Sequence, residues 1–234
     1  MVPRRCAYFL LSVACVSCGG AHPTTVEFYI VDGYRFSQAE RDTIQNIADA
    51  TALEVRRFLP TLAGELVLKV YPDGSDVIDE TGAAGSVAVP RVVYWTVDPK
   101  RAGGVVAIAK THLRSTLFHE FHHLVRGMSV SPESLVDHVI TEGMATVFER
   151  DFAGAVYPWG EYPDDVSAWV TELMALPNDA RRDPWMVRHP DGRRWIGYKA
   201  GTYLVDRAAK ASGKSAAELV SASTEDVIRM ALKE

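Results

Sequence analysis

The pattern of apolar and polar positions predicts a first half of mixed structure. Alternating or β-rich apolar runs, which are typical of strands, cover residues 26–31, 65–71, 92–97 and 105–109. Between the first two runs, apolar residues recur at helical spacing from a capping serine, Ser37, to Pro60. Residues 72–90 are rich in Gly, Asp, Ser and Pro, and we expect a loop there.

After residue 110 the pattern becomes mostly helical. The expected helices cover residues 111–126, 131–152, 164–176, 195–211 and 224–232. Ser131 with Pro132 is expected to open the second of these, because proline suits the first position of a helix. Polar, proline-containing loops are expected at 153–163 and 177–194. This order predicts an α+β fold, with one domain of two lobes over residues 26–234.

The N-terminus has the pattern of a secretory signal. Two arginines, Arg4 and Arg5, precede a short apolar run over residues 7–16, which ends in small residues. The segment around Cys18 resembles a bacterial lipoprotein signal, in which a cysteine becomes lipidated, although Cys15 stands where leucine is common. We therefore expect a signal peptide at 1–17, a linker at 18–25, and export to the cell envelope with a lipid anchor on Cys18.

Cysteine usage and charge exclude two other classes of protein. All three cysteines lie within the first 18 residues, so the folded domain has no disulfide framework. With 25 basic and 30 acidic residues the net charge is -5, which gives no electrostatic reason to bind nucleic acid. Hydrophobic residues make up 47% of the chain, an ordinary globular value that excludes a disordered protein.

One motif carries recognisable chemistry. His119, Glu120 and His123 form the pattern H-E-x-x-H within the expected helix 111–126. Histidines at i and i+4 project from one helix face, so both imidazoles can reach one Zn²⁺, and the glutamate between them can deprotonate the water that it activates. The strand expected at 105–109 leads into this helix, where it would form a sheet edge that pairs with an extended peptide.

A catalytic zinc needs a third protein ligand. The metzincin pattern fails, because Arg126 and Ser129 occupy the positions of its glycine and last histidine. Glu142 lies 19 residues past His123, on the next expected helix. Two antiparallel helices would bring Glu142 against the histidines, and Gly143 beside it would permit their close approach.

The H-E-x-x-H helix followed by E-G-x-A on the next helix resembles the gluzincin metalloproteases. More narrowly, the chain is similar to a bacterial family of predicted zinc-dependent proteases, which also carries a late G-Y-x-x-G helix, here at residues 197–201. The resemblance covers roughly residues 104–232. It implies a zincin-like fold, one Zn²⁺ per chain held by His119, His123 and Glu142, and Glu120 as the general base.

Several supporting roles stay open. Thermolysin-like gluzincins often have an aspartate four residues past the third ligand, but Thr146 stands there, so Glu149 or Asp137 is expected to orient a histidine. Tyr198 is the candidate donor to the oxyanion of the tetrahedral intermediate, with His189 as its rival and a core position as the alternative.

The expected function is zinc-dependent hydrolysis of a peptide bond in a peptide or protein substrate. The alternative is a non-catalytic exported lipoprotein that uses the same helices to bind a metal or a protein. Glu120 distinguishes the two, because a binding module needs no carboxylate between the histidines. Arginines within 177–194 could hold an anionic substrate group, but their pattern favours a solvated loop.

Overall fold

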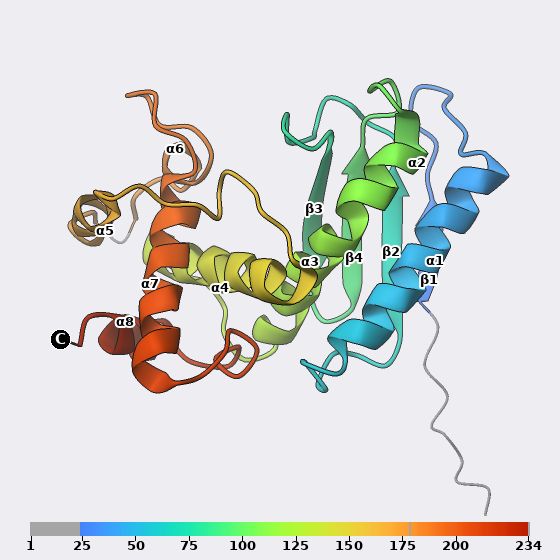
Figure 1. The fold of residues 1–234 in the computed structure, drawn as a ribbon. Helices are drawn as coiled ribbons and strands as arrows, with labels where there is room; N and C mark the ends of the chain where they lie inside the picture. The colour runs from blue at the N-terminus through green and yellow to red at the C-terminus, as the bar shows by residue number, and fades with distance from the viewer. Residues whose placement is uncertain (1–23, 178, 234) are drawn as a thin grey trace, which may run out of the picture.

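The computed structural model describes residues 24–177 and 179–233, so the expected signal peptide and Cys18 lie outside the described residues. A four-stranded sheet stands on one side of the molecule and a group of helices on the other (Figure 1). The strand order is β1-β2-β4-β3. The strands are β1 (Thr24–Phe28), β2 (Leu66–Tyr71), β3 (Ala83–Ala88) and β4 (Val92–Val97).

The sheet combines parallel pairing with one antiparallel edge. Strands β1, β2 and β4 run parallel, and β3 pairs antiparallel with β4, with Gly85 opposite Trp95. Leu66, Leu68 and Val70 alternate with more exposed residues along β2, as a sheet with one covered face requires. That face is covered by α1 (Gln38–Val55), which Ser37 caps as expected, and by α3 (Arg114–Arg126) (Figure 1).

Strand β3 corrects the expected loop at 72–90. Its sequence, Ala83 to Ala88, is made of small residues with a central glycine, so it carries little strand propensity of its own. It forms because β4 supplies the hydrogen-bonding partner for all six positions. The pairing is decided by tertiary structure and leaves β3 as an edge strand of the sheet.

The strand expected at 105–109 is wrong. Residues there form α2 (Gly104–Ile108), which continues through a π-helical turn at Ala109–Leu113 into α3. Val105, Ile108 and Ala109 are all buried, and their i, i+3 and i+4 spacing places them on one helix face. Burial of that face outweighs the strand preference of the β-branched residues. The sheet edge near the H-E-x-x-H motif is therefore β3.

The second lobe is helical, as expected. It contains α4 (Leu135–Ala153), α5 (Val166–Met174), the short α6 (Asp183–Met186), α7 (Ile196–Ser212) and α8 (Thr224–Ala231). Helix α4 begins after Ser134, whose side chain forms a capping box with Asp137, and not after Ser131. The capping box wins because it satisfies backbone N–H groups at both Ser134 and Asp137.

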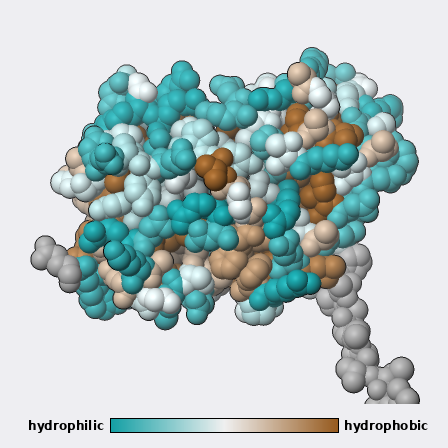
Figure 2. Space-filling model, viewed as in Figure 1, coloured by the Kyte–Doolittle hydropathy of each residue, from teal (hydrophilic) through white to brown (hydrophobic). Residues whose placement is uncertain are grey.

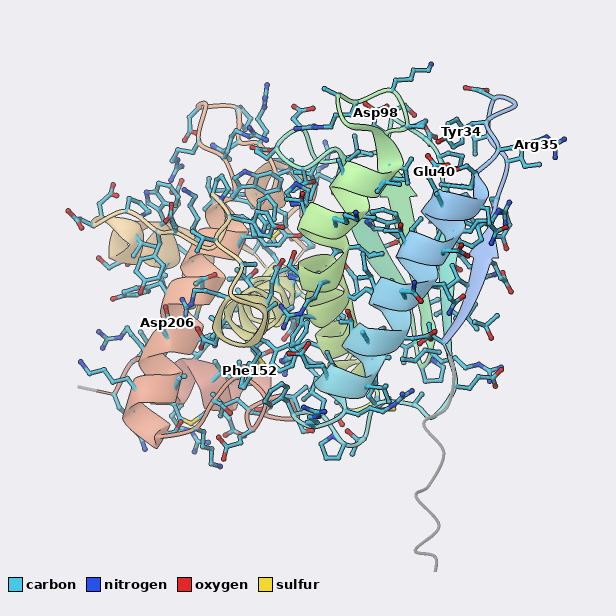
Figure 3. All side chains as sticks on the ribbon, turned by 45° about the vertical axis from the view of Figure 1, so that its right-hand side comes forward. Tyr34, Arg35, Glu40, Asp98, Phe152 and Asp206 are labelled. Carbon is cyan, nitrogen blue, oxygen red and sulfur yellow. The ribbon has the colours of Figure 1, made fainter. Side chains whose placement is uncertain are left out.

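Helices α4 and α7 cross at very close range. A Cβ atom at Gly143 of α4 would collide with the backbone of Gly201 of α7, so only glycine fits at that point. An ion pair adds to the contact: Arg150 of α4 donates to both carboxylate oxygens of Asp206 of α7, at 3.0 and 2.8 Å (Figure 3). This contact with α7 fixes the position of α4 along its axis and its rotation about that axis.

The two lobes are joined by packing and by charge. The rings of Phe58, after α1, and Phe152, in α4, lie 4.4 Å apart, centroid to centroid. Arg114 of α3 donates to Glu54 of α1 and to the backbone oxygen of Ala153. Apolar surface on the face in Figure 2 is confined to small separate patches. Among the described residues, none of the helices has the length and apolar character needed to span a membrane.

Candidate metal centre

Three side chains from two helices converge on one point. Nε2 of His119 lies 3.2 Å from Oε2 of Glu142, and Nε2 of His123 lies 3.3 Å from the same oxygen. One ligand atom from each residue lies within 4.8 Å of the others. The histidines come from successive turns of α3 and Glu142 comes from α4. The structure therefore brings together the three residues that the sequence singled out.

Close helix packing explains how Glu142 reaches the histidines. Its neighbour Gly143 removes the side chain that would push α4 away from α7. Glu142 and His119 are 8% and 9% exposed, so the cluster lies at the bottom of a depression and not on an open surface. A carboxylate at such a depth is costly unless it is paired or binds a metal.

The protonation of the cluster follows from its burial and contacts. Burial alone would lower the pKa of His119, but hydrogen bonds to Glu142 and Glu149 outweigh it and raise that pKa well above its ordinary value. Burial would raise the pKa of Glu142, but the charge of His123 and the histidine contacts hold it well below its ordinary value. A proton and a divalent cation therefore compete for the same donor atoms.

Glu149 holds His119 from the opposite side. Its Oε2 lies 3.1 Å from Nδ1 of His119, the ring nitrogen that faces away from Glu142. Glu149 follows Glu142 by seven residues, two helical turns, and so lies on the same face of α4. The other candidate for orienting a histidine, Asp137, caps the start of α4 instead. Thr146, one turn after Glu142, is buried with an unpaired hydroxyl.

Glu120 lies next to the cluster and beneath β3. It is 5% exposed, and burial raises the pKa of its carboxyl group. A Cβ atom at Gly85 of β3 would collide with the Glu120 carboxylate, so this glycine permits the edge strand to pass over it. A buried carboxylate with a raised pKa is suited to accept and return a proton near neutral pH.

Tyr198 faces the same depression, whereas His189 does not line it. The Tyr198 ring lies 6.4 Å from the His119 ring, centroid to centroid. Burial and the charges of Glu142 and Glu120 raise the pKa of Tyr198 well above its ordinary value, so its hydroxyl keeps its proton. His189 instead contacts Asp191, at 2.9 Å, and its ring packs on Trp185. The structure therefore gives no geometric support for His189 as the alternative donor to the oxyanion.

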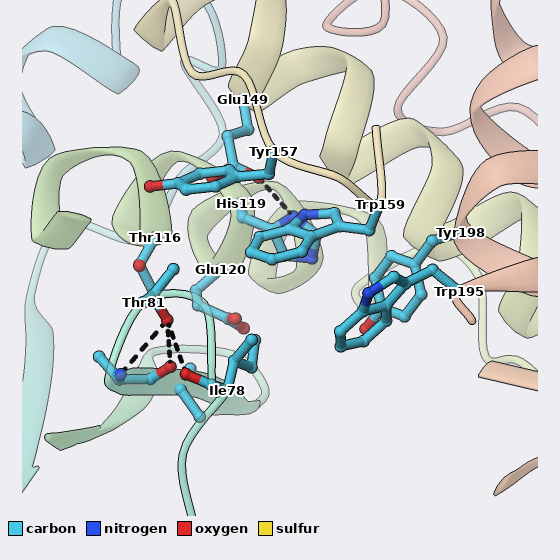
Figure 4. A pocket seen from close by; sticks show the side chains of 13 residues that line it. Ile78, Thr81, Thr116, His119, Glu120, Glu149, Tyr157, Trp159, Trp195 and Tyr198 are labelled. Carbon is cyan, nitrogen blue, oxygen red and sulfur yellow. Dashed lines mark hydrogen bonds and ion pairs between the residues drawn. The ribbon is translucent and has the colours of Figure 1, made fainter. Parts of the chain in front are cut away.

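Two cavities flank Glu120 and share His119, Gly85 and Tyr198 in their walls. The smaller, of about 70 Å³, is rich in aromatic residues (Figure 4). The larger, of about 320 Å³, extends towards the C-terminal half of β3 and contains His138 and Arg182. An Nη2 atom of Arg182 lies 3.8 Å from Oε1 of Glu142.

Some of these residues were missed in the sequence because their signal is weak. The arginine-rich segment 177–194 hinted at Arg182 without distinguishing it from its neighbours. Gly85 lies in a stretch that looks like a loop. His122, beside the motif, is fully buried against Phe148 and takes no part in the depression.

The fold and the site define a mixed α+β protein with a buried His-His-Glu cluster that could hold a metal ion. Comparison with protein families places the chain more narrowly. A family model described as Predicted Zn-dependent protease (DUF2268) matches residues 38–229, and the chain belongs to this family. No curated protein matches the sequence. The family name and the buried cluster together suggest zinc as the metal.

Proposed function

We propose that this protein is an exported zinc-dependent peptidase of the gluzincin type with a zincin-like fold. The observation that carries the proposal is the convergence of His119, His123 and Glu142 on one point, with Glu120 beside it. Membership in a family of predicted Zn-dependent proteases supports the same conclusion.

The donor set fits zinc. Two imidazole nitrogens and one carboxylate oxygen form a known catalytic zinc set, which leaves a coordination position open for water or substrate. In the proposal His119, His123 and Glu142 hold one Zn²⁺ per chain. When bound, the ion would polarise the scissile carbonyl and lower the pKa of a water molecule to about 7.

Two side chains of the protein would then handle the proton and the developing charge. Glu120 accepts the proton of the attacking water and passes it to the leaving amine. Tyr198 keeps its hydroxyl proton and donates a hydrogen bond to the carbonyl oxygen as that oxygen becomes negative. The exposed edge of β3 passes over Glu120, and a peptide could pair with it as an added strand.

The decisive experiment compares two glutamate variants. Glu142→Ala removes one of three protein ligands, so zinc affinity should fall strongly. Glu120→Gln keeps the size of the side chain but cannot accept the proton, so the protein should retain about one zinc and lose activity by 10²-fold or more. Elemental analysis of zinc, measured beside hydrolysis of a broad peptide library, reports both effects.

Each alternative has its own outcome. Full zinc content in Glu142→Ala would mean that the third ligand is misassigned. Peptide hydrolysis by Glu120→Gln at the parental rate would contradict the general-base role. A parent protein that binds zinc tightly but cleaves no peptide would favour the non-catalytic binding module.

The proposed role of Tyr198 predicts a loss of kcat when its hydroxyl is removed. Tyr198→Phe should lower kcat by roughly 10²-fold at saturating zinc, because the hydrogen bond to the oxyanion is removed. The same change removes the interaction of the hydroxyl with Glu142, so zinc content is measured beside the rate. Single-turnover measurements of peptide hydrolysis with the zinc-loaded variant test this. A kcat equal to that of the parent would return Tyr198 to a packing role.

We also propose that the mature protein is anchored in the cell envelope by lipid on Cys18. The support is the sequence alone: Arg4 and Arg5, the apolar run that follows, and Ser17 and Gly19 on either side of the cysteine. The peptide or protein substrate would then be met outside the cytoplasm.

A further inference from the structure

We propose that the smaller cavity beside Glu120 selects the substrate by binding one uncharged, medium-sized aliphatic side chain next to the bond that is cut. Such a side chain is that of Val, Leu, Ile or Met. The inference rests on the proposed peptidase function and adds its substrate class. We call this space the aromatic cavity, after the rings of Tyr157, Trp159, Trp195 and Tyr198 in its wall.

Aromatic and aliphatic side chains form about half of the wall of the aromatic cavity. Trp159 stacks on Tyr157 with ring centroids 4.4 Å apart, and Trp195 lies 5.4 Å from Trp159. In Figure 4 these rings line one side, Ile78 lies on the opposite side, and Glu120 lies between them. A side chain packed between these rings and Ile78 would exchange its contact with water for contact with carbon atoms.

Three hydroxyl groups in the wall are already engaged. The Tyr157 hydroxyl is 2.9 Å from Nδ1 of His112 and 2.8 Å from the hydroxyl of Ser115. The hydroxyl of Thr116 donates to the backbone oxygen of His112, and that of Thr81 donates to the oxygen of Ala83. These hydroxyls are therefore not free to pair with a polar side chain, and its desolvation would go uncompensated on their side of the cavity.

The charges in the wall argue against acidic and basic side chains separately. The two carboxylates nearest the cavity are those of Glu120 and Glu149, which would repel an acidic side chain. A basic side chain could approach Glu149 only in competition with His119, which Glu149 already contacts at 3.1 Å. An uncharged apolar group is the chemistry that remains.

The volume sets the size of the side chain. The aromatic cavity measures about 70 Å³. One water molecule needs roughly 10–15 Å³ on this scale, so the space takes on the order of five to seven heavy atoms. Aliphatic side chains of three to four heavy atoms fit within this space, whereas an indole ring, with nine heavy atoms, does not.

Trp195 shows strain where the cavity needs a fixed wall. Its backbone has φ of 60°, in the left-handed region that bulky residues rarely adopt. Its indole nitrogen is buried without a hydrogen-bond partner. Each feature costs on the order of 1–3 kcal/mol, and such costs concentrate at binding and catalytic sites. The positive φ and the unpartnered indole nitrogen thus occur at a residue whose ring lines the cavity.

Ile78 is the residue on which a test can be built. It is half-buried, lies outside the hydrophobic core, and lines the cavity from the loop before β3. Two residues beyond it, Glu80 forms an ion pair with Arg194, at 2.8 Å, which ties this loop to the residue before Trp195. Changing the size of residue 78 should therefore change the cavity without moving the helices that carry the metal centre.

The test measures cleavage preference in the zinc-loaded, mature protein. Cut sites in a peptide library are mapped by mass spectrometry for the parent, Ile78→Ala, Ile78→Phe and the control Leu53→Ala. In the parent, one position adjacent to the cut bond should favour Val, Leu, Ile and Met over charged residues by at least 10-fold in kcat/KM. Ile78→Ala should shift that position about 10-fold towards Phe and Tyr, and Ile78→Phe should shift it towards Ala.

The control separates a local effect from a general one. Leu53 is an aliphatic residue on the exposed side of α1, 45% exposed and away from the cavity, so its truncation should leave the preference unchanged. A preference for charged residues at that position would overturn the proposal. So would an unchanged preference in both Ile78 variants while cleavage continues.

A binding measurement distinguishes failure of this inference from failure of the peptidase function. Zinc-loaded Glu120→Gln is titrated with short peptides that differ only in Leu, Asp or Lys at the selected position, with tryptophan fluorescence as the signal from Trp159 and Trp195. Leu peptides should bind at least 10-fold more tightly, and Ile78→Phe on the same background should remove the difference. If the parent cleaves nothing but this preference holds, the cavity binds as proposed and only the hydrolysis is wrong. Equal binding of all three peptides would overturn the inference itself.

Discussion

At the scale of single residues, the site depends on contacts that orient the histidines. His119 makes two contacts with carboxylates, to Glu142 through Nε2 and to Glu149 through Nδ1. The second contact fixes the rotation of the ring and keeps Nε2 aimed at the ligand point. Glu149 would thus position His119. It lies two helical turns after Glu142 on α4, whereas thermolysin-like enzymes carry an aspartate four residues after the third ligand.

The positioning role of Glu149 predicts a loss of metal affinity. Glu149→Gln keeps the shape of the side chain but removes its charge, so the zinc dissociation constant should rise about 10- to 100-fold, with a smaller loss of kcat at saturating zinc. Competition with a chromogenic chelator measures the affinity, and circular dichroism checks that the fold is intact.

Thr146→Val is the matched control for Glu149→Gln. Thr146 is also buried on α4, but its hydroxyl has no partner, so replacing it with a methyl group should leave zinc affinity unchanged. Loss of zinc affinity in Thr146→Val with none in Glu149→Gln would reverse the assignment.

At the scale of elements, the site depends on how closely α4 approaches its neighbours. Glu142 reaches the histidines of α3 because α4 is fixed against α7 on its other side. The contact between Gly143 and Gly201 sets that distance, since there is no room for a Cβ atom. The glycine next to the third ligand therefore serves the crossing of α4 with α7, whereas the sequence suggested that it served the approach to α3.

Adding one methyl group where α4 crosses α7 should strongly destabilise the fold. Gly143→Ala inserts a Cβ atom into the backbone of Gly201, which cannot yield as a flexible side chain could. We expect the free energy of unfolding to fall by about 3 kcal/mol or more, at the upper end for overpacking, despite the better helix propensity of alanine. Urea denaturation followed by circular dichroism measures this.

A surface position on α7 provides the control. Ala211→Leu adds a larger group at an exposed position of the same helix, and it should change the unfolding free energy by less than about 0.5 kcal/mol. If Gly143→Ala proved as stable as the parent, the close crossing of α4 and α7 would be contradicted.

At the scale of the whole molecule, the chain joins a folded α+β region to an N-terminal segment whose sequence resembles a secretory signal. The family match covers residues 38–229, so strand β1 and the residues before it lie outside it. None of the described helices is able to span a membrane.

The lipid-anchor proposal predicts that membrane partitioning depends on Cys18. Cys18→Ser should move the protein from the membrane fraction to the soluble fraction of the cell envelope and change the mass of the mature N-terminus. Cys6→Ser and Cys15→Ser are the matched controls, because both cysteines lie within the expected signal peptide and would be absent from the mature protein. If Cys18→Ser still fractionated with membranes at the same processed mass, plain export or an uncleaved anchor would replace the proposal.

The sequence by itself determined the features that depend on local spacing. The i, i+4 relation places His119 and His123 on one helix face whatever surrounds them, and Ser37 caps α1 through atoms three residues apart. The ranges of β2, β4, α4 and α7 are likewise predicted to within a few residues. For Glu142, chain distance and helix order were enough to predict that it meets the histidines.

Only the tertiary structure decided the features that depend on distant partners. Strand β3 exists through its pairing with β4, and residues 104–108 are helical because one face of them is buried. The choice of Glu149 over Asp137, and the presence of Ile78 and Trp195 in one cavity, bring together residues that are far apart in the chain. Propensities act over a few neighbouring residues, whereas burial and strand pairing act between segments, and here the longer-range terms are the stronger.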